Sequence, residues 1–122
     1  MDPSLGRTVV HLSRGVLVGV LPAELTPSVL AQLQRDVLTS APLMQARGIV
    51  LDASAVQVMD AEDYGALCAL ARTCAVMGRP TVVCGLRAGV VSSLVELNVD
   101  TRAVATARNP DAAVRWLEAR VR

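Results

Sequence analysis

Near the start of the chain, the hydrophobic positions form two short β-branched stretches, residues 7–12 and 15–21. Ser13-Arg14 separates them, which predicts two strands joined by a tight turn. Thr26-Pro27 then combines an N-cap residue with proline in the first helical position. The apolar residues that follow recur at helical spacing, so we predict a first helix ending near residues 40–42. They are Leu30, Leu33, Val37 and Leu38.

The middle of the chain predicts one strand and one long helix. Residues 48–52 (GIVLD) are a short apolar run that ends in a carboxylate, as expected of a buried parallel strand. The loop ASAVQVM follows. From Asp60 an apolar stripe with a period near 3.6 predicts a helix that ends at Gly78. The stripe consists of Tyr64, Leu67, Leu70 or Ala71, Cys74 and Met77.

The last third repeats the alternation of strand and helix. Residues 80–86 predict a strand, and Val90, Leu94 and Leu97 mark a third helix closed by Asn98. Residues 104–107 predict a weak last strand, and residues 109–111 (NPD) repeat the cap-plus-proline signal before a final helix. The order ββαβαβαβα predicts an α/β fold with a mixed, mostly parallel sheet covered by helices. The residues predicted for its core are Leu67, Leu70, Cys74, Val83 and Leu94.

The composition limits which residues can fill the core and which kinds of functional site the chain can form. The 122 residues fit a single domain, residues 1–122, and Tyr64 and Trp116 are the only aromatic residues, so Val, Leu and Ala must fill the core. A net charge of +1 without charged runs argues against a nucleic-acid partner. All twelve basic residues are arginine, which excludes a Walker-A loop and a Schiff-base lysine. With His11 as the single histidine and no glycine-rich phosphate loop, we expect no enzyme, metal or cofactor.

The cysteines and the hydropathy pattern bear on where the protein works. Cys68, Cys74 and Cys84 form no C-x-x-C pair and lie in apolar surroundings, so we expect buried free thiols and a reducing compartment. The start MDPSLGRTVV does not read as a signal peptide, and the apolar runs fall short of the roughly 20 residues of a membrane helix. A cytoplasmic location without a membrane partner is the expectation.

The segment VQVMDAEDYG places three carboxylates within four residues at a predicted helix start. Metal binding, catalysis, capping and a docking or modification site are all candidate roles. A receiver-type site with Asp52 as phosphate acceptor would need an acidic pair after the first strand and a lysine after the last, and both are missing. Capping by Asp60 with Glu62 and Asp63 behind it is physically sound, at about 0.3–1 kcal/mol for each carboxylate in the first turn. Three carboxylates repel one another, however, and stability alone needs fewer.

A resemblance to a known family gives this segment a second role. In chain order, GIVLDAS, V-x-V-M-D, a helix running to M-G, TVVCGLR and VVSSLVELNVD resemble the STAS family, which includes anti-sigma-factor antagonists and stressosome proteins. Within the family the likeness is greatest to the RsbS type of single-domain stressosome scaffold. It is carried by RGIVLDASAVQVMD, the eighteen-residue step from Asp60 to Gly78, and GLRAGVVSSLVELNVDT, and it is strongest over residues 48–101.

The resemblance implies a STAS-like fold and a partner-switching function without catalysis. The residue after the loop aspartate is usually a serine or threonine that a switch kinase phosphorylates, and here Ala61 occupies this phosphoacceptor position. Implied partner-binding residues are Asp60, Ala61, Glu62 and Asp63. Arg87, which begins the third predicted helix, is a candidate for charge pairing with a partner, and a solvated arginine at a helix end is an equally good interpretation. Implied partners are RsbR-like STAS paralogues, in a large homo- or hetero-oligomer, and an RsbT-like serine/threonine kinase.

Alternatives remain at this point. Ala61 is either the natural residue or a replaced serine, and Glu62 is a candidate partial mimic of phosphate. A free-standing antagonist that binds an anti-sigma factor directly predicts a monomer or dimer without a large complex. A small-ligand or nucleotide sensor is disfavoured because the chain offers few polar pocket residues.

Overall fold

A computed structural model describes residues 9–120 and begins with a β-hairpin. Strands β1 (Val9–Ser13) and β2 (Val16–Val20) pair antiparallel, in a register that runs from Val9 opposite Val20 to Ser13 opposite Val16. The turn consists of Arg14 and Gly15, both with positive φ (55° and 78°), as a two-residue type I′ connection requires. The turn predicted at Ser13-Arg14 is therefore wrong by one residue: Ser13 ends the first strand, and Gly15 belongs to the turn and not to the second strand. Residues 7 and 8 of the predicted first strand lie outside the described residues.

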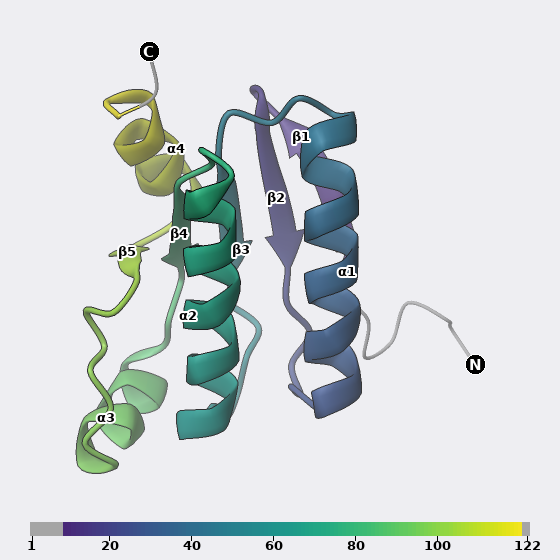
Figure 1. Ribbon diagram of the computed structural model, residues 1–122. Helices are drawn as coiled ribbons and strands as arrows, with labels where there is room; N and C mark the ends of the chain where they lie inside the picture. Colours follow the sequence, from purple (N-terminus) through teal and green to yellow (C-terminus); the bar gives the residue numbers. More distant parts are fainter. Residues whose placement is uncertain (1–8, 121–122) are drawn as a thin grey trace.

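The remaining strands extend the sheet in parallel. Strands β3 (Ile49–Asp52), β4 (Thr81–Cys84) and β5 (Ala105–Ala107) follow β2, so the order across the sheet is β1-β2-β3-β4-β5 (Figure 1). Among the strands within residues 9–120, only the β1–β2 pair is antiparallel. The predicted mixed, mostly parallel α/β sheet is therefore confirmed, and its edges are β1 and β5.

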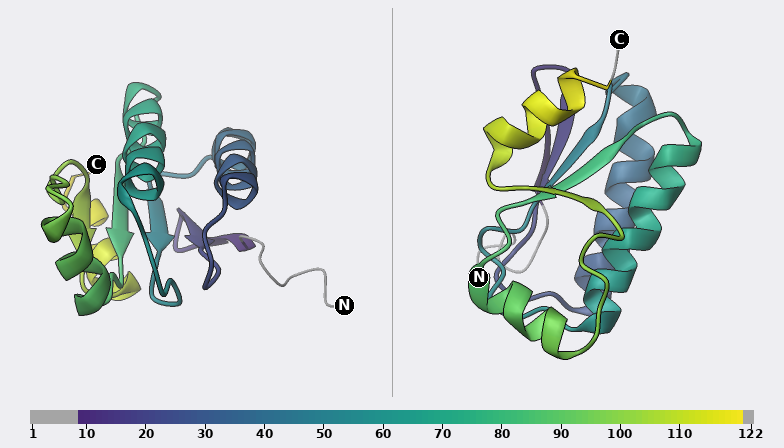
Figure 2. Two further views of the ribbon diagram at one scale, coloured as in Figure 1. Left: turned by 90° about the horizontal axis from the view of Figure 1, so that it is seen from below. Right: turned by 90° about the vertical axis from the view of Figure 1, so that its left-hand side faces the viewer.

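Helices α1 (Pro27–Leu43) and α2 (Ala61–Val76) cover one face of the sheet, and α4 (Pro110–Glu118) lies on the other (Figure 2). Helix α3 (Ala88–Glu96) lies beyond the end of the sheet at which β2, β3 and β4 finish (Figure 1). The predicted caps are confirmed, because the side chains of Thr26 and Asn109 accept backbone N–H groups at 3.1 and 2.8 Å. Helix α1 runs through Pro42 to Leu43, slightly past its predicted end.

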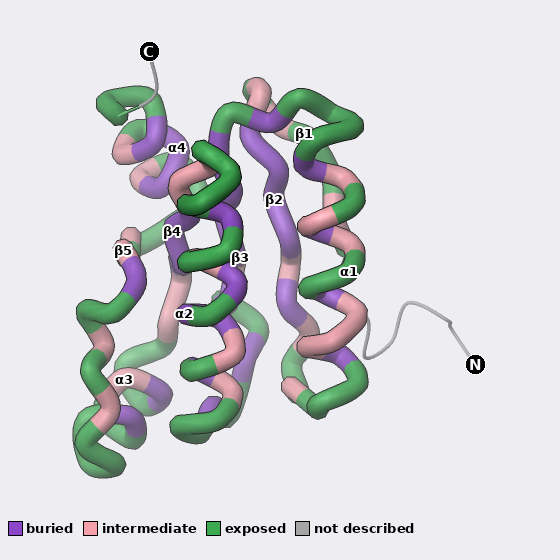
Figure 3. Tube along the Cα trace, viewed as in Figure 1, coloured by how far each residue is buried: buried purple, intermediate pink, exposed green. Residues whose placement is uncertain are grey.

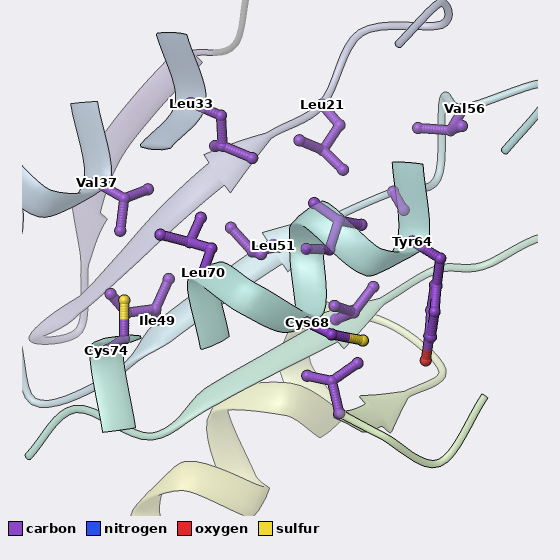
Figure 4. Packing of buried hydrophobic residues seen from close by; sticks show 14 of the residues in the cluster. Leu21, Leu33, Val37, Ile49, Leu51, Val56, Tyr64, Cys68, Leu70 and Cys74 are labelled. Carbon is purple, nitrogen blue, oxygen red and sulfur yellow. The ribbon is translucent and has the colours of Figure 1, made fainter. Parts of the chain in front are cut away.

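The larger hydrophobic cluster lies between the sheet and α1 and α2, as the close view in Figure 4 shows. The inner faces of both helices are buried, and their outer faces are exposed (Figure 3). A smaller cluster lies between the sheet and α4. All five residues predicted for the core are buried; they are Leu67, Leu70, Cys74, Val83 and Leu94. The predicted stripes of α2 and α3 extend one residue too far, because Met77 and Leu97 are C-cap residues just past the two helices and are 39% and 52% exposed.

The three cysteines are buried and free, as predicted. Burial raises the pKa of each thiol, and that of Cys84 rises to about 12 because burial and the nearby charge of Asp52 both disfavour the thiolate. These sulfurs are therefore poor nucleophiles. Within residues 9–120, no helix combines the length and apolar character that crossing a membrane requires.

Candidate partner-binding site at the start of helix α2

The segment singled out in the sequence lies at one end of the molecule. Helix α2 begins where the parallel strands finish, at the end that also carries α3 (Figure 1). In α/β sheets this carboxyl end is where binding sites are usually found, since the connecting loops gather there. The acidic helix start is thus displayed on the side of the fold that most often meets partners.

A complete capping box fixes the first turn of α2. The Asp60 side chain accepts the Asp63 backbone N–H at 2.8 Å, and the Asp63 carboxylate accepts the Asp60 backbone N–H at 3.1 Å. This confirms the capping role of Asp60 and assigns a second cap residue, Asp63. Ala61, the first residue of the helix, and Glu62 take no part in the box and are exposed.

Buried side chains and a backbone hydrogen bond fix the loop that leads into α2. Val56 and Met59 are fully buried, whereas Gln57 and Val58 between them point outward, and Val58 is 73% exposed. The Gln57 backbone N–H donates to the carbonyl of Ala23, in the loop between β2 and α1, at 3.1 Å. The loop therefore presents its exposed residues from a fixed backbone.

Tyr64 anchors the first turn of α2 from the other side. Its ring is almost completely buried, and its hydroxyl donates to the carbonyl of Thr101 at 2.6 Å. Burial, with smaller contributions from the charges of Cys68 and Asp100, raises the pKa of Tyr64 to about 12. The single tyrosine of the chain thus ties the candidate site to the segment between α3 and β5.

The charge at this helix start is not neutralised within the described part of the chain. None of the ion pairs among residues 9–120 involves Asp60, Glu62 or Asp63. Burial raises the pKa of Asp63, and the neighbouring charges of Asp60 and Glu62 add to that rise, although its backbone hydrogen bond opposes it. The three carboxylates therefore disfavour further negative charge at this position.

Arg87 stands apart from the acidic cluster in its contacts. It is the exposed N-cap residue of α3, makes no side-chain cap, and donates its Nε to the carbonyl of Ser54 at 3.0 Å. Ser54 in turn donates its backbone N–H to the Asp52 carboxylate at 3.0 Å. Arg87 thus braces the β3–α2 loop, a contact that sequence spacing did not reveal.

The fold adds residues that the sequence did not single out. A shallow hollow of about 480 Å³ lies where the β2–α1 loop meets the β3–α2 loop, with Glu24, Leu25 and Val58 beside Asp60 and Asp63. Glu24 and Asp60 are far apart in the chain, so only the parallel topology brings them together. Within the described residues, no three histidine, cysteine, aspartate or glutamate side chains are placed to hold a metal ion.

The sheet order, the helices on its two faces and the exposed start of α2 define an α/β domain of the STAS fold. Two similar solved structures are an RsbS serine-to-glutamate variant from Moorella thermoacetica and a chain of the stressosome, described as a signal integration and transduction hub. The first has a TM-score of 0.77 at 25% identity and covers 93% of this chain and 96% of its own. The second has a TM-score of 0.76 at 25% identity, over 93% and 100%.

A third similar structure supports the fold alone. A candidate anti-sigma factor antagonist from Thermotoga maritima has a TM-score of 0.73 at 17% identity and covers 91% of this chain and 94% of its own. Protein-family models and curated proteins give no match to the sequence. The two neighbours at 25% identity, an RsbS variant and a chain of the stressosome, confirm the resemblance to the STAS family predicted from sequence.

Proposed function

We propose that this chain is a non-enzymatic STAS protein of the RsbS type that works by partner switching in a stressosome-type assembly. In this role it would assemble with RsbR-like STAS paralogues and hold an RsbT-like serine/threonine kinase until stress releases it. The similarity to RsbS and to a stressosome chain over 93% of this sequence supports the assembly part. The cytoplasm is the compartment that this role requires.

The proposed regulation of kinase binding is supported by the position and exposure of Ala61. It is exposed, it is the first residue of a helix whose cap is complete, and it stands between Asp60 and Glu62. A hydroxyl at this position would be accessible to a kinase and held on a rigid turn. Ala61 has no hydroxyl, so the surface stays in its unmodified state.

The electrostatics explain how phosphate would act there. A phosphate adds about −1.5 to −2 charges. The helix N-terminus favours an anion, but Asp60, Glu62 and Asp63 already occupy that turn and lack internal ion pairs in the described chain. The added charge would remain largely uncompensated and would repel an acidic partner or obstruct one packed closely against Ala61.

A binding titration tests this proposal. We expect Ala61→Ser to be phosphorylated at residue 61 by an RsbT-type kinase from the same genome, and the phosphate to weaken kinase binding by about 1–3 kcal/mol, an effect that salt partly screens. Ala61→Glu should weaken binding less. Ala69→Ser is the matched control, since Ala69 is exposed on the same helix two turns further on. Equal affinities for all forms would remove the switch assignment.

A further inference from the structure

Helices α1 and α2 lie side by side on one face of the sheet, and their first turns are at the same end of the molecule (Figure 1). Between the N-terminal halves of the two helices lies a groove of about 300 Å³, which we call the α1–α2 groove. Its lining is mostly apolar and includes both buried and half-buried side chains. The lining residues are Pro27, Leu30, Ala31, Leu33, Gln34, Glu62, Asp63, Ala66, Leu67 and Leu70.

The α1–α2 groove continues into the hollow of about 480 Å³ at the start of α2. Asp63 lines both cavities, and the hollow adds the apolar side chains of Leu25 and Val58. From Pro27 to Gln34 the groove follows α1 for about 10 Å, at 1.5 Å per helical residue. With the hollow at one end, the combined surface is long enough for about two to three turns of a further helix.

The charge along this surface is negative and unbalanced. Four carboxylates line it, those of Glu24, Asp60, Glu62 and Asp63. Within residues 9–120, no arginine or histidine lines either cavity, and none of the ion pairs involves these four residues. Arg35, the only basic residue of α1, instead donates to Gln32 at 2.8 Å. The two helix starts supply only about half a positive charge each, so negative charge remains in excess.

The charge and the shape of this surface decide which chemistry fits it. Nucleic acids and anionic membrane surfaces carry the same sign of charge and are repelled. The walls are helices, whose backbone groups are paired within each helix, so an extended strand would find no ladder to join. A helix needs no backbone partner, and it presents apolar residues at positions i, i+3, i+4 and i+7 as one stripe. Arginine or lysine beside that stripe would supply the missing positive charge.

We propose that the α1–α2 groove and the adjoining hollow bind a cationic amphipathic helix of a partner protein. Its apolar stripe lies over Leu30 and Ala66, which are half-buried, and its basic side chains pair with the four carboxylates. The inference goes beyond the proposed function, because it assigns a second surface. Successive helical residues are about 100° apart, so Asp63 and Ala66 share the groove side of α2, whereas Ala61 faces the opposite side and lines neither cavity.

Two synthetic peptides of about 14 residues test the chemistry of the partner. One places leucine at helical spacing with arginine beside the stripe, and the other has the same composition in scrambled order. Fluorescence anisotropy with the full chain should show at least about tenfold tighter binding of the amphipathic peptide, weakened about tenfold between 0.05 and 0.5 M salt. Equal binding of the two peptides would reduce the interaction to charge attraction and overturn the inference, as would the absence of binding.

Charge variants test whether the carboxylates of the surface are the ones that bind. Glu24 and Glu62 take no part in the capping box, so Glu24→Gln and Glu62→Gln should each leave the fold intact and weaken the amphipathic peptide about threefold. Glu96→Gln is the matched control, since Glu96 is an exposed acid of α3 that lines neither cavity. Equal effects of all three variants would contradict the assigned surface.

A blocking variant tests the groove itself. Ala66→Arg fills the α1–α2 groove with a bulky cation and should weaken the amphipathic peptide at least about tenfold, whereas Ala69→Arg, on the exposed side of α2, should not. Circular dichroism checks that both variants fold. Unchanged affinity in a folded Ala66→Arg variant would overturn the inference. Ala61→Glu should not weaken peptide binding, although the proposed function expects it to weaken kinase binding, so the two proposals fail separately.

Discussion

The two ends of helix α2 differ in charge and in the contacts that fix them. The first turn carries three carboxylates, a complete capping box and the buried, hydrogen-bonded ring of Tyr64. The last turn carries no basic residue, and Val76 is 89% exposed. At that end Gly78 has φ 80°, the backbone N–H of Arg79 donates to the carbonyl of Cys74 at 2.9 Å, and the Arg79 side chain donates to the carbonyl of Met77 at 3.4 Å.

The contrast distinguishes what is needed to form and end the helix from what holds its exposed first residues in a fixed geometry. This helix ends in an uncharged last turn, with Met77 as its C-cap and Gly78 directly after it, so its end does not require a charged side chain in the last turn. The first turn is tied to Thr101 through the Tyr64 hydroxyl, and the β3–α2 loop that leads into it is tied to the β2–α1 loop through Gln57 and Ala23. Anchoring of this kind holds Ala61 and Glu62 in one geometry, which is useful at a surface that a partner must recognise.

The largest expected effect on the free energy of unfolding comes from the buried face of α2, between the two ends compared above. Leu70 is 4% exposed in the middle of α2, so Leu70→Ala should lower the free energy of unfolding by about 2–5 kcal/mol through lost burial and the cavity left behind. Val76→Ala is the control on the exposed side and should stay within about 0.5 kcal/mol. Urea denaturation measures both. A change below half a kilocalorie for Leu70→Ala would mean that α2 packs through a different face.

The next prediction concerns the anchored end and its dependence on pH. Because Tyr64 is the only tyrosine, its absorbance near 295 nm reports this site alone. The folded pKa of about 12 lies above the ordinary value of 10.0, so the folded state holds the proton more tightly. Stability from Tyr64 is therefore complete below pH 10.0 and is lost as pH rises through about 12.

Spectroscopic titration checks this difference directly. In urea the tyrosinate signal should appear near the ordinary pKa of 10.0, and in the folded protein near 12 or only together with unfolding. The control is Tyr64→Phe, which removes both the signal and the hydrogen bond to Thr101. Its expected cost is about 0.5–1.5 kcal/mol. Titration of the native protein near pH 10 would contradict the anchoring of this end.

A smaller effect is expected from the cap itself. Asp60→Ala removes the acceptor for the Asp63 N–H and should cost about 1 kcal/mol in the free energy of unfolding. Asp60→Asn keeps a capping side chain and should cost only a few tenths of that. The same denaturation experiment compares them. If the two variants lose equal stability, the charge of Asp60 matters more than its hydrogen bond, and the cap assignment has to be revised.

Local signals in the sequence predicted the element boundaries well. Each capping or terminating residue acts within one turn of its helix, so the local sequence is sufficient to place the helix ends. These residues are Thr26-Pro27, Asp60, Gly78, Asn98 and Asn109-Pro110. The hairpin turn was predicted one residue too early. In the sequence Gly15 adjoins the apolar residues of the second strand, and its positive φ is seen only in the folded turn. The core residues of α2 followed from helical period alone.

By itself, the sequence determined the α/β order, the caps, the buried face of α2 and the identity of Ala61 at its first position. Only the tertiary structure decided that Glu24 and Val58 share a hollow with Asp60, that Tyr64 reaches Thr101, that Arg87 braces the loop at Ser54, and that β1 is left at an edge. The physical reason is the range of the interactions. Caps and periodic burial act between residues a few positions apart, whereas these contacts join segments that meet only after parallel strands have been placed side by side.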